Sequence, residues 1–102
     1  MIERDQLTSA IESLLFSAGK ASSITELARI LEVDATLVSA GLRQLQTEYQ
    51  ESRAGIRIII LENQAELVTA PENFSVVKKL IDYEKADITD AQLETLTIIA
   101  YQ

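Results

Sequence analysis

The chain has 102 residues, enough for one compact domain and little more, and 47% of them are hydrophobic. It contains neither cysteine nor histidine, which excludes disulfides, thiolate nucleophiles, Cys/His zinc sites and the commonest general base near neutral pH. Sixteen acidic residues against nine basic ones give a net charge of −7, a poor balance for binding the phosphates of nucleic acid.

The acidic residues are scattered singly along the chain, whereas catalytic carboxylates come as a pair held in a shielded cleft. We therefore expect no enzymatic activity, no cofactor and no bound metal. No apolar run approaches the roughly 20 residues that span a bilayer, and Met1–Asp5 lacks the basic-then-apolar order of a signal peptide. A cytoplasmic protein without a membrane segment is the expectation.

The first predicted helix is capped by Asp5 and ended by Gly19. Its buried stripe recurs at helical spacing and consists of Leu7, Ala10, Ile11, Leu14, Leu15 and Ala18. Phe16 points away from this stripe. Either a second element of the same domain covers Phe16, or a partner protein does, since aromatic residues are enriched in interface cores.

A second and a third helix follow after a short interval. Ser23-Ile24-Thr25-Glu26 is a capping box that opens a short helix. Asp34 then caps a longer helix that runs to about Gln50, with Val38, Leu42, Leu45 and Tyr49 facing inward. Gly41 lies in the apolar sector of this helix, where its missing side chain lets a neighbouring helix approach closely.

The hydrophobic period changes at Gly55, because the isoleucine-rich run from Ile56 to Leu61 is typical of a strand. Asn63-Gln64 is the predicted turn, and residues 65–69 return as a second strand. If Ile56, Ile58 and Ile60 face the core, alternation places Ile59 and Leu61 on the opposite face. That pair is covered either by a helix of the same domain or by another chain.

Pro71 begins a further helix that reaches about Glu84, and Lys85-Ala86-Asp87 is a polar break. Thr89-Asp90-Ala91-Gln92 is a second capping box, and the helix after it is apolar around most of its circumference. Such a helix must be buried. Its candidate partner-binding or second-domain residues are Leu93, Leu96, Ile98, Ile99 and Tyr101. We therefore divide the chain into a first domain (1–84), a linker (85–88) and the first helix of a truncated second domain (89–102).

The order of elements predicts a mostly helical α+β fold: a winged helix-turn-helix with three helices, a two-stranded wing and an extra helix after the wing. In DNA-binding proteins of this architecture the third helix enters the major groove. Here Arg43 is the single cation on the exposed face of that helix, so charge disfavours direct DNA binding. A DNA-binding transcriptional regulator remains the alternative function.

The segment Ala91–Gln102, AQLETLTIIAYQ, resembles the opening of the second winged helix in the segregation and condensation protein B family, whose usual form is A-x-L-E-T-L-x-I-I-A-Y-x-Q. Ile11–Gly19 and Glu66–Glu72 resemble that family's first helix and its wing return. Members often have a glycine-rich turn and an aromatic residue in the hairpin, where this chain has Asn63-Gln64-Ala65. Wing-tip contacts are therefore not carried over from the family.

The resemblance implies a non-catalytic subunit with two tandem winged helices that dimerises through the first and binds the kleisin subunit, segregation and condensation protein A. With the SMC ATPase these proteins form the bacterial condensin, which associates with the nucleoid. The candidate dimer interface is Phe16, Ile59 and Leu61. Little or no direct DNA binding is expected, and this chain should hold the kleisin more weakly than a longer protein with a complete second domain.

Overall fold

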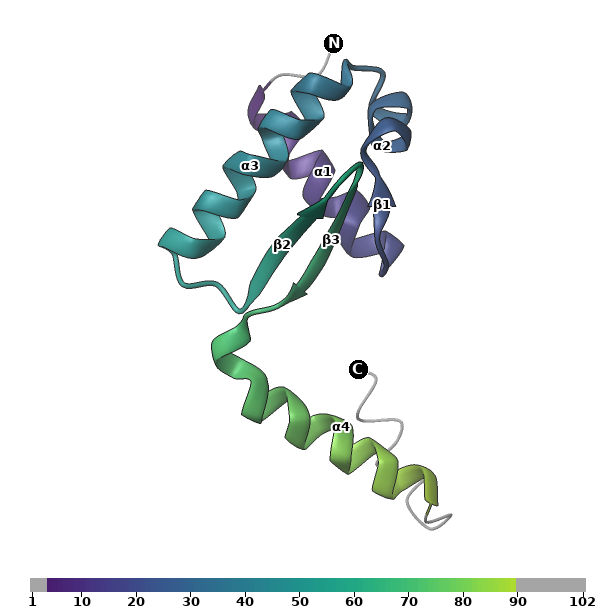
Figure 1. The fold of residues 1–102 in the computed structure, drawn as a ribbon, viewed down its shortest axis with the longest axis vertical. Coiled ribbons are helices and arrows are strands. Elements are labelled where there is room, and N and C mark those ends of the chain that lie inside the picture. The colour runs from purple at the N-terminus through teal and green to yellow at the C-terminus, as the bar shows by residue number, and fades with distance from the viewer. Residues whose placement is uncertain (1–3, 90–102) are drawn as a thin grey trace. The chain divides into compact units, whose positions relative to one another are not determined.

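The computed structural model describes residues 4–89. Their elements, drawn in Figure 1, are α1 (Arg4–Ala18), β1 (Ser22–Ser23), α2 (Ile24–Leu31), α3 (Ala35–Glu51), β2 (Ile56–Leu61), β3 (Gln64–Thr69), a 3-10 turn (Pro71–Asn73) and α4 (Phe74–Thr89). The chain divides into two compact units between Ala70 and Pro71, here called unit 1 and unit 2. The predicted mostly helical winged helix, with an extra helix after the wing, is confirmed.

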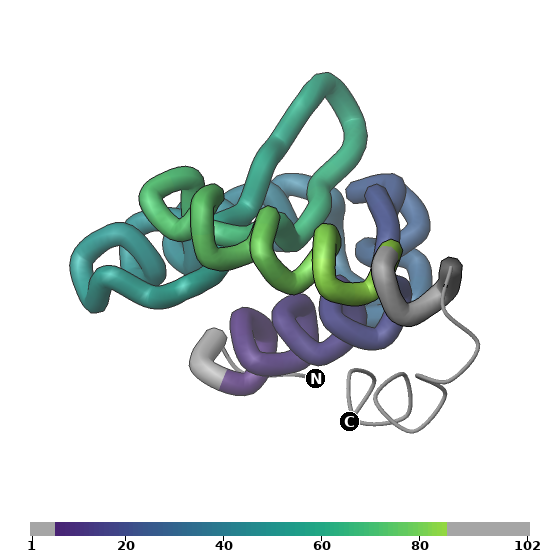
Figure 2. Tube along the Cα trace, turned by 90° about the horizontal axis from the view of Figure 1, so that it is seen from below, coloured from purple at the N-terminus to yellow at the C-terminus, as the bar shows by residue number. Residues whose placement is uncertain are grey.

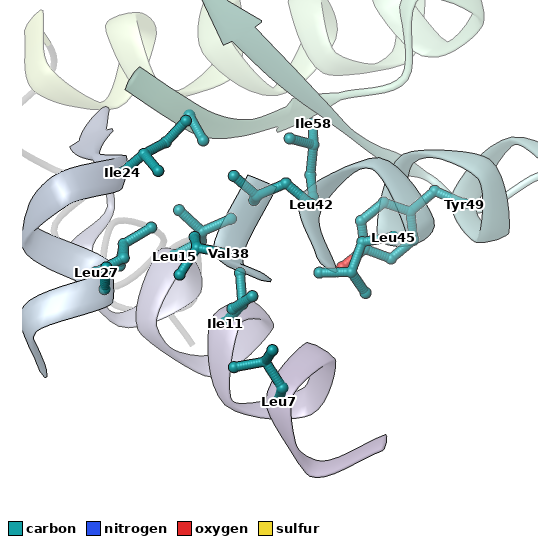
Figure 3. Close-up of a cluster of buried hydrophobic side chains, with 12 residues drawn as sticks. Leu7, Ile11, Leu15, Ile24, Leu27, Val38, Leu42, Leu45, Tyr49 and Ile58 are labelled. Carbon is teal, nitrogen blue, oxygen red and sulfur yellow. The ribbon is translucent and has the colours of Figure 1, made fainter. Parts of the chain in front are cut away.

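One hydrophobic core holds unit 1 together. Figure 3 shows side chains of α1, α2 and α3 converging, with Ile58 of β2 above them. The most deeply buried large side chains are Ile11, Leu15, Val38 and Leu42. The residues predicted to face inward from the third helix are all buried. Periodicity therefore identified the core correctly, although Ala18 at the end of the α1 stripe is exposed.

Gly41 marks the place where α1 crosses α3. A Cβ atom at this position would lie 2.8 Å from Cδ1 of Ile11, closer than side-chain carbons approach one another. The close helix contact predicted from this glycine is confirmed.

The helix ends follow the capping signals in most cases. Oγ of Ser23 accepts a hydrogen bond of 3.2 Å from the amide of Glu26 at the start of α2, and Gly19 ends α1 with a φ of +65°. The prediction that Asp5 caps α1 is wrong, because the helix already includes Arg4. An acidic residue is favourable in the first turn as well as at the cap, so the residue type did not distinguish the two positions.

The sheet has three antiparallel strands in the order β1-β3-β2, one more than predicted. Ser22 and Ser23 pair with Ala65 and Gln64, and this strand of two residues is too short to show an alternating pattern. The predicted turn also shifts by one residue, since Leu61 pairs with Gln64 and the turn is Glu62-Asn63. Glu62 has a φ of 55°, a conformation that its residue type does not signal.

The helix after the wing is longer than predicted. α4 continues to Thr89, so the polar break expected at Lys85-Ala86-Asp87 is helical instead. The physical reason is that Lys85 and Ala86 are good helix formers and that neither glycine nor proline interrupts the segment. The predicted helix of a second domain, with Leu93, Leu96, Ile98, Ile99 and Tyr101, lies outside the described residues, and the predicted division of the chain into two domains stays a prediction.

Candidate interaction surfaces

The outer face of the β2–β3 hairpin carries exposed aliphatic side chains among polar ones. Figure 2 shows the hairpin on one side of unit 1 and α1 on the opposite side. Along β2, Ile58 is buried against the helices, whereas Ile59 is 51% exposed and Leu61 is 71% exposed. The predicted alternation is therefore confirmed, and within the described part of the chain no helix of unit 1 covers the pair. We call the outward-facing side chains Arg57, Ile59, Leu61, Gln64, Glu66 and Val68 the hairpin face.

An open hollow of about 430 Å³ lies at the tip of the hairpin face. Its lining comprises Ala21, Ile59, Leu61, Glu62, Asn63, Gln64, Ala65 and Glu66. Aliphatic side chains therefore lie beside carboxylates in this hollow. Such a lining suits a partner protein that presents an apolar group surrounded by polar residues.

Phe16 is 80% exposed, so the alternative in which another element of the fold covers it is not realised among residues 4–89. It lies one turn after Glu12 on the same flank of α1. Phe16 does not line the hairpin hollow, so the structure brings Ile59 and Leu61 together but does not place Phe16 beside them.

A hydrogen bond fixes the flank of α1 that carries Phe16. Oη of Tyr49, on α3, donates to Oε2 of Glu12 over 2.6 Å. Burial raises the pKa of the Tyr49 phenol well above its usual range, and the hydrogen bond and the negative charges of Glu12 and Glu48 raise it further. The phenol therefore stays a neutral donor at physiological pH and holds α1 against α3.

A second concave surface lies between the end of α1 and α2, and sequence reasoning missed it. This α1–α2 groove has a volume of about 350 Å³ and is lined by Leu14, Ser17, Ala18, Lys20, Ala21, Ser22, Glu26, Leu27 and Ile30. Ile30 is 62% exposed at its edge. The available signal was that Ile30 falls outside the apolar stripe of the second helix, which left a large aliphatic residue without a place in the core.

The surface that would bind DNA in this architecture is poorly equipped for it. Arg43 is exposed, but it is the single basic residue between Ala35 and Glu51. The tip of the wing is attached to α2: the carbonyl of Asn63 accepts a hydrogen bond of 2.8 Å from the amide of Ile24, and Nδ2 of Asn63 donates to Oγ1 of Thr25 over 3.0 Å. A wing held in this way has no free tip to follow the DNA backbone.

Two further findings bear on function. Among residues 4–89, no three acidic side chains come together in a way that could hold a metal ion. None of the helices in that range is both long and apolar enough to cross a membrane.

Comparison with known proteins decides the family. The family described as segregation and condensation complex subunit ScpB matches residues 9–102. The chain belongs to the ScpB family. A segregation and condensation protein B from Clostridium botulinum (strain Kyoto / Type A2) is 39% identical over 101 residues, which is 98% of this chain and 52% of that relative. The chain thus spans about half the length of such relatives.

Two solved structures share this fold. One, a dimer of an ScpB N-terminal domain complexed with an ScpA peptide, is 31% identical with a TM-score of 0.66; the match covers 72% of this chain and 91% of that one. The other, ScpB from Mycobacterium tuberculosis, is 24% identical with a TM-score of 0.76; the match covers 99% of this chain and 64% of that one. Both comparisons show that solved ScpB structures share the fold described above.

Proposed function

We propose that this chain is a non-catalytic accessory subunit of the bacterial SMC–kleisin condensin, in which it dimerises and binds the kleisin subunit ScpA. One observation carries the proposal: unit 1 exposes apolar surface on a fold whose solved relative is a dimer holding an ScpA peptide. The function is to hold proteins together for chromosome condensation and segregation. The protein reaches the nucleoid through this complex.

Ile59 and Leu61 on the hairpin face are the proposed centre of the dimer interface. A two-fold interface places one surface against its own copy, so the surface must be complementary to itself. The hairpin face can meet this condition, because Ile59 and Leu61 lie together on β2 and Glu66 stands directly opposite Ile59 on β3. Phe16 is proposed as a further dimer contact, although it lies outside the hairpin hollow.

Kleisin binding by unit 1 is supported by the relative whose N-terminal domain was solved with an ScpA peptide. The surface predicted at Leu93, Leu96, Ile98, Ile99 and Tyr101 is proposed as an additional site for the kleisin or for a second domain.

The alternative function, a DNA-binding transcriptional regulator, has less support. The net charge of −7 and the single cation of α3 give little attraction for phosphates. The attachment of Asn63 to α2 also leaves the wing without a free tip. The salt dependence of binding to random duplex DNA separates the two functions, because a regulator shows a steep dependence whereas a scaffold scarcely binds.

The test is to measure the mass of the chain alone and after mixing with ScpA from the same organism, by size-exclusion chromatography with light scattering. The expected result is a dimer alone and a larger species of defined mass after mixing. A chain that is monomeric at high micromolar concentration and leaves the elution of ScpA unchanged would contradict the proposal.

A further inference from the structure

The β2 strand forms one outer edge of the sheet, because the strand order is β1-β3-β2. Edge strands present backbone groups with which a strand of another chain can pair. The sequence of β2, Ile56–Leu61, has four isoleucines and a single charge in six residues, a composition typical of segments that stack into intermolecular sheets. An open edge at this strand would therefore promote sheet formation between copies of the chain.

The register of the hairpin identifies the backbone groups that point toward this outer edge. Leu61 pairs with Gln64 across a turn of two residues, and in an antiparallel pair every second residue turns its N–H and C=O toward the partner strand. Starting from that pair, alternation turns the backbone groups of Ile60, Ile58 and Ile56 away from β3. A strand added at the edge would have to bond to these three residues.

Two side chains already occupy outward carbonyls of this edge. Nε2 of Gln46, on α3, donates a hydrogen bond of 2.8 Å to the carbonyl of Ile58, in the middle of the strand. Nη1 of Arg57 donates to the carbonyl of Ile56 over 3.0 Å, at the start of the strand. Figure 1 shows α3 on the side of β2 that faces away from β3, which is where Gln46 reaches the strand. The remaining outward residue, Ile60, stands next to the turn, and one residue is too short to pair with another strand.

We propose that Gln46 closes the β2 edge to strand addition by another copy of this chain. Its amide occupies the carbonyl at the centre of the edge, so an incoming strand would have to displace a partly buried hydrogen bond before a ladder could form. A second copy is thereby limited to the side chains that the hairpin presents, and the sheet ends at the three strands of one molecule. This inference goes beyond the proposed function, because it holds whether the chain dimerises through the hairpin face or stays a monomer.

Gln44 provides a matched control on the same helix. It is exposed, and its Nε2 donates to Oε2 of Glu48, also on α3, over 3.0 Å. The two glutamines share residue type, helix and helix propensity, and they differ in whether the amide reaches the strand. In both cases the contact is made by a side chain, which a substitution removes without any change in the backbone.

The test compares Q46A with Q44A in the 102-residue chain, by size-exclusion chromatography with light scattering over a concentration series. Alanine removes the amide in both variants and raises helix propensity equally. We expect Q46A to form species heavier than those of the unchanged chain, whereas Q44A keeps the masses of the unchanged chain. Q46K should restore the original masses, because lysine is a long donor and brings the charge that natural edge strands carry.

Amide hydrogen exchange, measured residue by residue, shows where the copies of Q46A meet. Strand addition would bond the outward amides, so exchange at Ile58 and Ile60 should slow at least about fivefold in the heavier species, the factor that one hydrogen bond of average net strength gives. Ile59, whose amide faces β3, should change little.

Three results would overturn the proposal: equal masses of Q46A and Q44A, heavier species that Q46K forms as readily as Q46A, or heavier species without slower exchange at Ile58 and Ile60. Heavier species that appear only where far-UV circular dichroism shows unfolded helices would also overturn it, since they would report lost stability instead of an open edge. The mass of the unchanged chain tests the proposed dimer separately.

Discussion

Replacing Ile59 and Leu61 by threonine should convert the proposed dimer to monomers. Threonine keeps the β propensity of each position but removes most of the apolar area that the hairpin face offers. The two side chains are 51% and 71% exposed in the single chain, so the monomer depends little on them. Its free energy of unfolding should change by less than about 0.5–1 kcal/mol.

The effect on association is expected to be much larger. Full burial of one such side chain contributes roughly 1.5–3 kcal/mol, and between half and three quarters of that gain remains available at these two positions. Two residues on each of two protomers give an upper estimate of about 4–8 kcal/mol, of which association entropy and polar desolvation consume a part. We expect at least a hundredfold rise in the dimer dissociation constant, or roughly 3 kcal/mol.

Sedimentation velocity over a dilution series measures that constant, and L37Q serves as the control with one exposed aliphatic residue removed elsewhere on unit 1. The variant should also be more soluble, because an uncovered apolar hairpin promotes aggregation. If the double variant dimerises as tightly as L37Q, the hairpin face is not the interface, and Phe16 on α1 becomes the next position to test.

The remaining predictions concern stability and DNA. Y49F removes the 2.6 Å hydrogen bond to Glu12 and should lower the free energy of unfolding in urea by about 1–2 kcal/mol at neutral pH. If the pairing is right, Y49F should lower the free energy of unfolding by less when it is made in the E12Q variant than in the unchanged chain. Because the folded pKa of Tyr49 is raised, its contribution is complete below pH about 10 and is lost at higher pH, a dependence that Y49F should abolish. E32G should stabilise the chain by about 0.5–1 kcal/mol, because Glu32 ends α2 with a φ of 59°, a conformation that glycine adopts without steric cost. A lower denaturation midpoint for E32G would contradict this prediction. No defined duplex should form a nanomolar complex at physiological salt, because Arg43 stands alone on α3; one such complex by anisotropy would refute this.

The fold was largely predictable because most of its core comes from strong local patterns. The inward residues of α3, the closure of α1 at Gly19 and the close approach at Gly41 all follow from spacing or from the absence of a side chain. The errors lie where local patterns are silent. β1 has only two residues, and the turn begins with Glu62 in a left-handed conformation that its residue type does not signal.

The candidate surfaces were predictable to different degrees for a physical reason. Ile59 and Leu61 emerge from the alternation of one strand, which sequence shows directly. The α1–α2 groove depends on how the last turn of one helix lies against the next, and no single period contains both Ala18 and Ile30. The break predicted at Lys85-Ala86-Asp87 shows the converse error, since these residues are typical of a surface turn but are equally compatible with a helix.

The attachment of the wing to α2 connects the stability of the fold with its function. Asn63 joins the hairpin turn to Ser23 and Thr25, and β1 pairs with Ala65 and Gln64 beside that turn, so the tip of the hairpin is fixed. A wing that supports a protein interface gains from rigidity, because less entropy is lost on association. The hydrogen bonds that hold the tip of the wing against α2 therefore also hold the adjoining residues Ile59 and Leu61 as a preformed surface.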